Sequence, residues 1–252
     1  MKKVFLFLLL TTIGSSTIFF SCKKDQPNAG NVPNELIAIE KYGEIHNEVL
    51  DLYYKKVGLK GTQSLDEKIK YIDECLSQVV DDFEEGSFTI IVNSNQFNVK
   101  TNIELISNSE NDIETGNIII NELYTNNQIT ENERDYYFTI LETYEIYSSN
   151  LANLKNQLQE IENTILLDEF ISQTERNNLL KVMSISISSV EYWEIDTKNL
   201  TTKAIPSWIA KDCVGAVTSV QTGLTGYATL LFGPAGGAIT TLGAAAICSA
   251  IK

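Results

Sequence analysis

The sequence predicts an all-α protein: a long-helix bundle with coiled-coil-like packing, followed by a C-terminal glycine-zipper helical hairpin. Three observations predict this fold. Apolar residues recur at spacings of three and four through most of residues 34–195, which is the period of an amphipathic helix. Hydroxyl residues followed three positions later by Glu mark helix starts. In residues 207–252, small residues recur every four positions, which lets two helix backbones approach closely.

Residues 1–21 are typical of the signal peptide of an exported chain. Two lysines precede an apolar run that is short and is interrupted by Thr, Gly and Ser, which favours a signal peptide over a membrane span. Ser21-Cys22 resembles a bacterial lipobox, in which Cys22 becomes the acylated first residue. The alternative is an ordinary cleaved signal with an incidental cysteine. We therefore expect a lipid anchor on Cys22, an outer-membrane location facing the periplasm or the cell surface, and a tether over residues 22–33.

Composition narrows the function classes. The 19 Lys and Arg residues against 33 Asp and Glu residues give a net charge of −14. This charge argues against a nucleic-acid partner, because such binding needs a basic footprint, and against electrostatic docking on anionic lipid. Because the chain has a single histidine, most arrangements of a Ser-His-Asp catalytic triad and all metal sites built from several histidines are excluded. We expect no cofactor, no metal site and no enzymatic activity.

The first helix is expected from about Pro33 to Lys56. His46 lies on its apolar stripe together with Gly43, which predicts a structural histidine and a glycine that lets a facing helix come close. The acidic residues of this segment fall on other faces of the helix: Glu44, Glu48 and Asp51. The alternative function of His46 is a general base or metal ligand that works with these carboxylates.

Three segments carry helix-start signals. Ser64 and Glu67 have the spacing of a capping box, in which each side chain satisfies a backbone donor of the other residue. Residues 129–134 and 171–176 match each other in pattern, with an offset of 42. In each, an apolar residue precedes the hydroxyl, and Glu and Arg follow. Shared capping chemistry is the favoured interpretation, and an internal duplication is the alternative.

The clearest periodicity predicts one continuous helix from Thr130 to about Leu167, roughly 55 Å long at 1.5 Å per residue. Its apolar positions follow a strict heptad pattern: Tyr137, Ile140, Tyr144, Tyr147, Leu151, Leu154, Leu158, Ile161 and Ile165. The next helix, with Leu179 to Trp193 on one face, is the expected antiparallel partner. A homo-oligomeric coiled coil is the alternative.

Residues 86–128 carry the weakest signal. Eleven asparagines lie between Asn93 and Asn132, and Asn is poor in helix and strand interiors. A β-hairpin of the flanking stretches 88–92 and 97–99 is one alternative, but an isolated hairpin is marginal. We expect an irregular excursion that leads into a helix near 111–123. The spacing in 111–122 is like that of an EF-hand, but the side chain of Ile113 cannot ligate calcium at the third position.

A linker over residues 196–206 is expected to precede the C-terminal hairpin. No charged residue occurs from Cys213 to Ile251. The glycines expected to pack the two arms together are Gly215, Gly223, Gly233 and Gly237. Cys213 and Cys248 lie in the two arms and are the first pair to test for a disulfide. The hairpin is expected to be buried against the bundle, and the alternative is insertion into a membrane.

Three stretches, the Gly-x-x-His-Asn segment within 43–50, residues 186–193 and the glycine-rich tail, resemble a group of Bacteroidetes-type lipoproteins. The resemblance is confined to these stretches and implies no particular activity. We expect a cell-envelope lipoprotein with a non-enzymatic binding, structural or protein-interaction role, whose partner is another envelope protein. The alternative is a membrane-active protein, bacteriocin-like or pore-forming, that inserts its C-terminal hairpin into a target bilayer.

Overall fold

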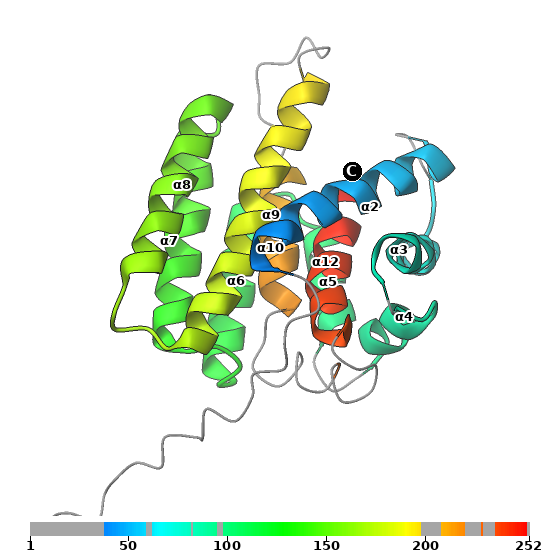
Figure 1. The fold of residues 1–252 in the computed structure, drawn as a ribbon, viewed down its shortest axis with the longest axis horizontal. Helices are drawn as coiled ribbons and strands as arrows, with labels where there is room; N and C mark the ends of the chain where they lie inside the picture. Colours follow the sequence, from blue (N-terminus) through cyan, green and yellow to red (C-terminus); the bar gives the residue numbers. More distant parts are fainter. Residues whose placement is uncertain are drawn as a thin grey trace, which may run out of the picture. The chain divides into compact units, whose positions relative to one another are not determined.

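The computed structural model describes residues 38–58, 62–81, 83–94, 98–197, 208–219, 228 and 235–250. All regular structure in these ranges is helical, and no strand occurs in them, which confirms the all-α prediction (Figure 1). The helices are η1 (Ile39–Lys41), α2 (Tyr42–Val57), α3 (Leu65–Val79), α4 (Ser87–Val92), α5 (Val99–Ser107), α6 (Asp112–Thr125), α7 (Glu131–Tyr147), α8 (Leu151–Leu167), α9 (Gln173–Thr197), α10 (Trp208–Ser219) and α12 (Ala235–Ala250). The predicted signal peptide and tether lie outside the described residues.

The capping boxes begin helices where the sequence predicts them. At α3, the Ser64 N–H donates to the Glu67 carboxylate at 2.9 Å, and Ser64 Oγ accepts from the Glu67 N–H. Thr130 and Glu133 make the same reciprocal pair at α7, at 2.8 and 3.2 Å. Each pair satisfies backbone donors that the first helical turn leaves without an intrahelical partner.

The single helix predicted over residues 130–167 is wrong. α7 ends at Tyr147 and α8 begins at Leu151, because Asn150 accepts a hydrogen bond from the Asn153 N–H at 3.0 Å and caps a new helix. Ser and Asn favour caps over helix interiors, and three of them occur together at 148–150. Most heptad positions are still buried, now in two helices: Tyr137, Ile140, Tyr144, Leu154, Leu158 and Ile165. Tyr147, Leu151 and Ile161 are half-buried.

α8 and α9 run antiparallel, as predicted for the helix that follows the heptad pattern. Lys155 near the start of α8 pairs with Glu191 near the end of α9 at 2.5 Å. At the opposite end, Arg176 of α9 donates to the Ile165 carbonyl of α8 at 3.2 Å. α9 continues to Thr197, two positions into the predicted linker.

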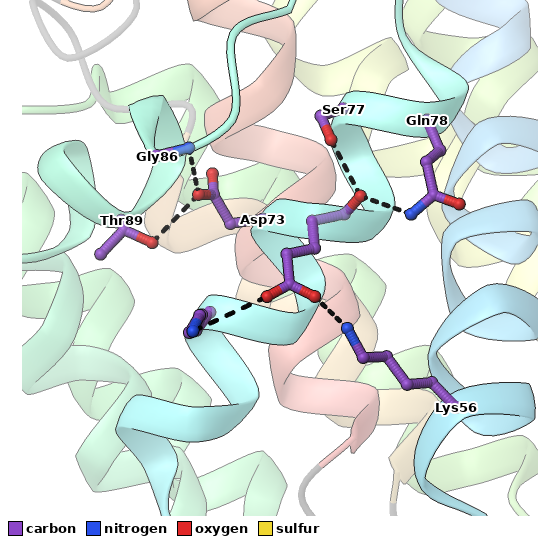
Figure 2. Close-up of polar contacts among 8 residues, drawn as sticks. Lys56, Asp73, Ser77, Gln78, Gly86 and Thr89 are labelled. Carbon is purple, nitrogen blue, oxygen red and sulfur yellow. Dashed lines mark hydrogen bonds and ion pairs between the residues drawn. The ribbon is translucent and has the colours of Figure 1, made fainter.

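The irregular excursion expected before α6 is also wrong, because this stretch contains two short helices, and the β-hairpin considered as the alternative is absent from its described residues. Residues 88–92 lie in α4, and Val99 begins α5. α4 begins where it does because Asp73 of α3 caps it from outside. The Asp73 carboxylate accepts from Gly86 N–H (2.5 Å) and Thr89 Oγ1 (3.2 Å) (Figure 2). It also accepts from Phe88 N–H (2.9 Å). The helix expected near 111–123 is confirmed as α6.

α2 crosses α9 at Gly43. A Cβ on Gly43 would overlap Ser188 Oγ and the backbone oxygen of Ser184, so only glycine allows this approach. The Gly43 N–H donates to Ser184 Oγ at 3.0 Å, and Asn47 Nδ2 donates to the Ser188 carbonyl at 3.0 Å. The close approach predicted for Gly43 is therefore present.

A continuous apolar core includes residues from α2 through α12. α10 and α12 lie within it, with α7 and α8 toward one side and α3 and α4 toward the other (Figure 1). Every side chain described for α12, from Gly237 to Ala250, is buried. A helix that is apolar on all faces belongs in a core or in a membrane, and in this structure α12 lies in the core.

Candidate functional site

Three helices meet at the buried carboxylate of Asp212 in α10. Its Oδ2 accepts from Ser189 Oγ and from Trp193 Nε1 (3.2 Å) of α9, and its Oδ1 accepts from Ser249 Oγ of α12. All four side chains are fully buried. Burial raises the pKa of Asp212, while His46 and the three hydrogen bonds oppose that rise. Because Asp212 accepts hydrogen bonds from α9 and from α12, the buried cluster joins α9, α10 and α12.

His46 lies close to this cluster, from α2. It is fully buried, and its Nδ1 lies 3.0 Å from Asn47 Oδ1. Its Nε2 has no hydrogen-bond partner within the described residues. The carboxylates that would assist it as a general base are exposed to solvent: Glu44, Glu48 and Asp51. This placement agrees with a structural histidine, whose role stays a prediction.

The predicted hairpin residues are only partly described. Gly223, Gly233 and the lipidation residue Cys22 lie outside the described residues, whereas Gly237 is buried in α12. A Cβ on Gly215 would lie 2.8 Å from the Ala244 carbonyl oxygen of α12. α10 and α12 therefore approach at backbone distance at that point.

The two cysteines of the predicted disulfide are buried and free in the structure. Burial raises the pKa of Cys213 to about 12. Cys248 Sγ lies instead beside Gly215, 2.8 Å from where its Cβ would be. The disulfide stays a prediction.

The residue before Asp212 is also buried and charged. Lys211 Nζ lies 3.5 Å from Asp112 Oδ1 at the start of α6. The pair joins α10 to α6 from inside the protein. Removing one member of a buried pair leaves an uncompensated charge, so Lys211 and Asp212 fix the position of α10 from two directions.

The end of α8 and the turn that follows it carry the two most exposed large apolar side chains of the described ranges. Leu167 is 81% exposed and Phe170 is 94% exposed, and Leu166 beside them is 50% exposed. We call Leu166, Leu167 and Phe170 the apolar turn surface. Neighbouring exposed apolar side chains are unfavourable in water, and such clusters commonly mark binding sites.

Hydrogen bonds hold this turn in one conformation. Asp168 Oδ2 accepts from Tyr136 OH of α7 at 2.7 Å, and Asp168 Oδ1 accepts from the Phe170 N–H at 2.8 Å. The Arg176 guanidinium donates to the backbone carbonyls of Ile165 (3.2 Å) and Asp168 (2.5 Å). Three helices thus support the apolar turn surface.

Two acidic residues, Asp168 and Glu169, lie between Leu167 and Phe170 in the sequence, and we call them the acidic rim of the apolar turn surface. The hydrogen bond from Tyr136 and then the one from Phe170 N–H hold the pKa of Asp168 below its usual value, so Asp168 is ionised at neutral pH. Glu169 beside it is exposed. The nearest cation, Arg176, is engaged by the backbone of the turn.

Sequence reasoning missed this surface, although a signal was present. The heptad pattern ends at Ile165, and Leu166 and Leu167 fall outside it. Three consecutive apolar residues cannot all face the core from one helix. The excess apolar side chains therefore had to be exposed or bound elsewhere.

Within the described parts of the chain, no three His, Cys, Asp or Glu side chains gather in a way that would hold a metal ion. No helix in those same ranges is both long and apolar enough to span a membrane. Comparison of the chain with known protein families, with curated proteins and with solved structures finds no match.

Proposed function

We propose that this chain is a lipoprotein of the cell envelope, anchored in the outer membrane through an acylated Cys22. Its helical body binds another envelope protein and catalyses no reaction. The long helices form a rigid body, inside which α10 and α12 pack as a glycine-zipper hairpin. Residues 22–33 act as a tether that lets the body reach its partner.

The observation that carries the binding role is the exposure of Phe170 on a turn that is held by hydrogen bonds. A large side chain presented in a fixed conformation loses little entropy on binding. Aromatic anchors that enter a partner's pocket dominate many interfaces. Phe170, with Leu167 next to it, has the properties of such an anchor.

The charge of the rim favours a protein partner over an anionic membrane. Asp168 and Glu169 lie between Leu167 and Phe170 in the sequence, and their negative charges are repelled by anionic lipid. A protein pocket that is apolar at its centre and carries Lys or Arg at its edge would complement both features. We expect the binding to weaken as the salt concentration rises.

Affinity purification from native envelopes tests this role. The wild-type protein is compared with Phe170→Ser and with Ile118→Ser, a control on α6 whose side chain is 51% exposed. We expect one protein to co-purify with the wild type and with the control but not with Phe170→Ser. Equal recovery with all three proteins would exclude the apolar turn surface as the contact.

The second candidate function is a membrane-active protein that inserts the C-terminal hairpin into a target bilayer. It is favoured by the enclosure of α12, whose described side chains are all buried by other helices. An apolar segment kept from water in this way could be released at a bilayer. Residues 213–251 also carry no charge that would oppose insertion.

Liposome flotation separates the two functions. A soluble chain starting at Lys23 is mixed with dye-loaded liposomes, with and without residues 207–252. Flotation and dye release that require residues 207–252 would favour the membrane-active function. Protein that stays at the bottom of the gradient in both cases would favour the binding function.

A further inference from the structure

α12, which follows the other helices of the described residues in the chain, lies at the centre of the core. α12 contacts α2, α3, α4, α5 and α10, and its described side chains are all buried. These neighbours come from the first 107 residues and from α10. The helices of the N-terminal half of the body therefore pack around a helix that follows all of them in the chain.

Specific contacts fix α12 among these helices. A Cβ on Gly243 would overlap the Phe88 ring, so α4 packs directly on the α12 backbone. Tyr54 OH of α2 donates to the Ser249 carbonyl at 3.0 Å, and Ser249 Oγ donates to Asp212 of α10. These contacts require one position and one rotation of α12.

Two of the surrounding helices are too short to persist alone. α4 has 6 residues and α5 has 9, and isolated helices shorter than about 12–15 residues are marginal in water. Their stability must come from packing, and the packing surface of both includes α12. Phe88 and Ile103 are fully buried in these helices.

We infer that the body does not complete its fold until α12 joins it, and that α2, α3, α4, α5 and α10 together form a binding groove for residues 235–250. A chain that emerges N-terminus first then stays incompletely folded until α12 is available. This inference is independent of the proposed partner binding, since it concerns a different part of the protein.

Cleavage and reassembly test the inference. A protease site is placed within residues 220–227, the folded protein is cut, and the two fragments are separated in urea. The large fragment is refolded alone, with a peptide of residues 235–252, or with a scrambled peptide of the same composition. Thermal unfolding is followed by circular dichroism.

The large fragment alone is expected to lose the cooperative thermal transition of the uncut protein. The native peptide is expected to restore it, and the scrambled peptide is not. A cooperative transition in the large fragment alone would overturn the inference. So would failure of the native peptide to restore the transition, or equal restoration by the scrambled peptide.

Discussion

Thr130 Oγ1 donates a hydrogen bond to Glu175 Oε1 at 2.6 Å and so joins the starts of α7 and α9. The link is reciprocal, because Asn178 Nδ2 of α9 donates to Glu133 Oε1 of α7 at 2.9 Å. The two matching sequence motifs therefore lie side by side. In each motif, the capping Glu also accepts a hydrogen bond from the other helix.

Replacing Glu175 with Gln is expected to lower the free energy of unfolding by about 1 kcal/mol, the typical contribution of a helix cap. Burial opposes ionisation of Glu175, but hydrogen bonds from Thr130, Ser172 and Asn132 outweigh it and hold the pKa below the usual 4.5. The stabilisation is therefore fully present above pH 4.5 and is lost as the pH falls through the lower folded value. Urea unfolding between pH 3 and 6 should show a weaker pH dependence in this range for Glu175→Gln, and an unchanged dependence would contradict the role of the charge.

Gly43→Ala is expected to destabilise the protein by about 1–3 kcal/mol, as overpacking does in other cores. The added Cβ would overlap Ser188 Oγ, which can rotate away, and the Ser184 backbone oxygen, which cannot. Adding Ser188→Ala should consequently rescue little of the loss. Urea unfolding measures both variants, with the exposed Glu44→Ala as control, and complete rescue in the double variant would show that the backbone contact is unimportant.

Asp212→Ala is expected to lower the free energy of unfolding by about 3 kcal/mol or more, because it leaves the buried Trp193 indole N–H and two serine hydroxyls without their acceptor. Asp212→Asn keeps an acceptor and should lose much less. Equal losses of unfolding free energy in the two variants would show that the hydrogen bonds to Asp212 do not account for its contribution to stability.

The same residue gives a pH dependence of opposite sign to that of Glu175. Burial raises the pKa of Asp212 above 3.8, so ionising it costs stability as the pH rises from the unfolded to the folded value. Asp212→Asn lacks this cost. Its stability relative to the wild type should therefore increase from pH 3.8 upward and then level off, and a constant difference would contradict the raised pKa.

Phe170→Ser is expected to leave the free energy of unfolding within about 0.5 kcal/mol of the wild type, as for other exposed positions, because the ring is 94% exposed.

Tyr136→Phe, by contrast, removes the hydrogen bond to Asp168 and should make the turn between α8 and α9 easier to cleave by a protease. Limited proteolysis and thermal unfolding check both variants. A large loss of stability in Phe170→Ser would mean that the ring is buried in solution.

Cys22→Ala is expected to abolish incorporation of labelled palmitate and to move the protein out of the outer-membrane fraction. The thioether-linked lipid needs the thiol, and no other residue of the predicted lipobox supplies one. Metabolic labelling followed by membrane fractionation measures both effects. Labelling that persists in Cys22→Ala would contradict lipidation at this position.

Local chemistry made much of the fold predictable. The capping boxes at Ser64 and Thr130 depend on residues three apart, and the structure contains both. The apolar stripe of α2 likewise predicted the close approach at Gly43. These features involve neighbours in sequence, or a face that a helical period defines.

Three features of the structure were not predicted from the sequence: the helix α4, the break between α7 and α8, and the apolar turn surface. The cap on α4 comes from Asp73, thirteen residues before Gly86. No local sequence pattern therefore predicts a helix at residues 87–92. The break at Asn150 was local, but the uninterrupted heptad pattern outweighed it in the prediction. The apolar turn surface depends on which of three consecutive apolar residues faces the core, and only Ile165 does.

Site-specific photo-crosslinking in living cells tests the proposed binding role most directly. A photoreactive amino acid is introduced at position 170 or, as the control, at position 118, and the cells are illuminated. We expect position 170 to give one discrete crosslinked product with an envelope protein, weakened by Leu167→Ser, and position 118 to give none. Identical products from both positions, or none from position 170, would contradict binding through the apolar turn surface.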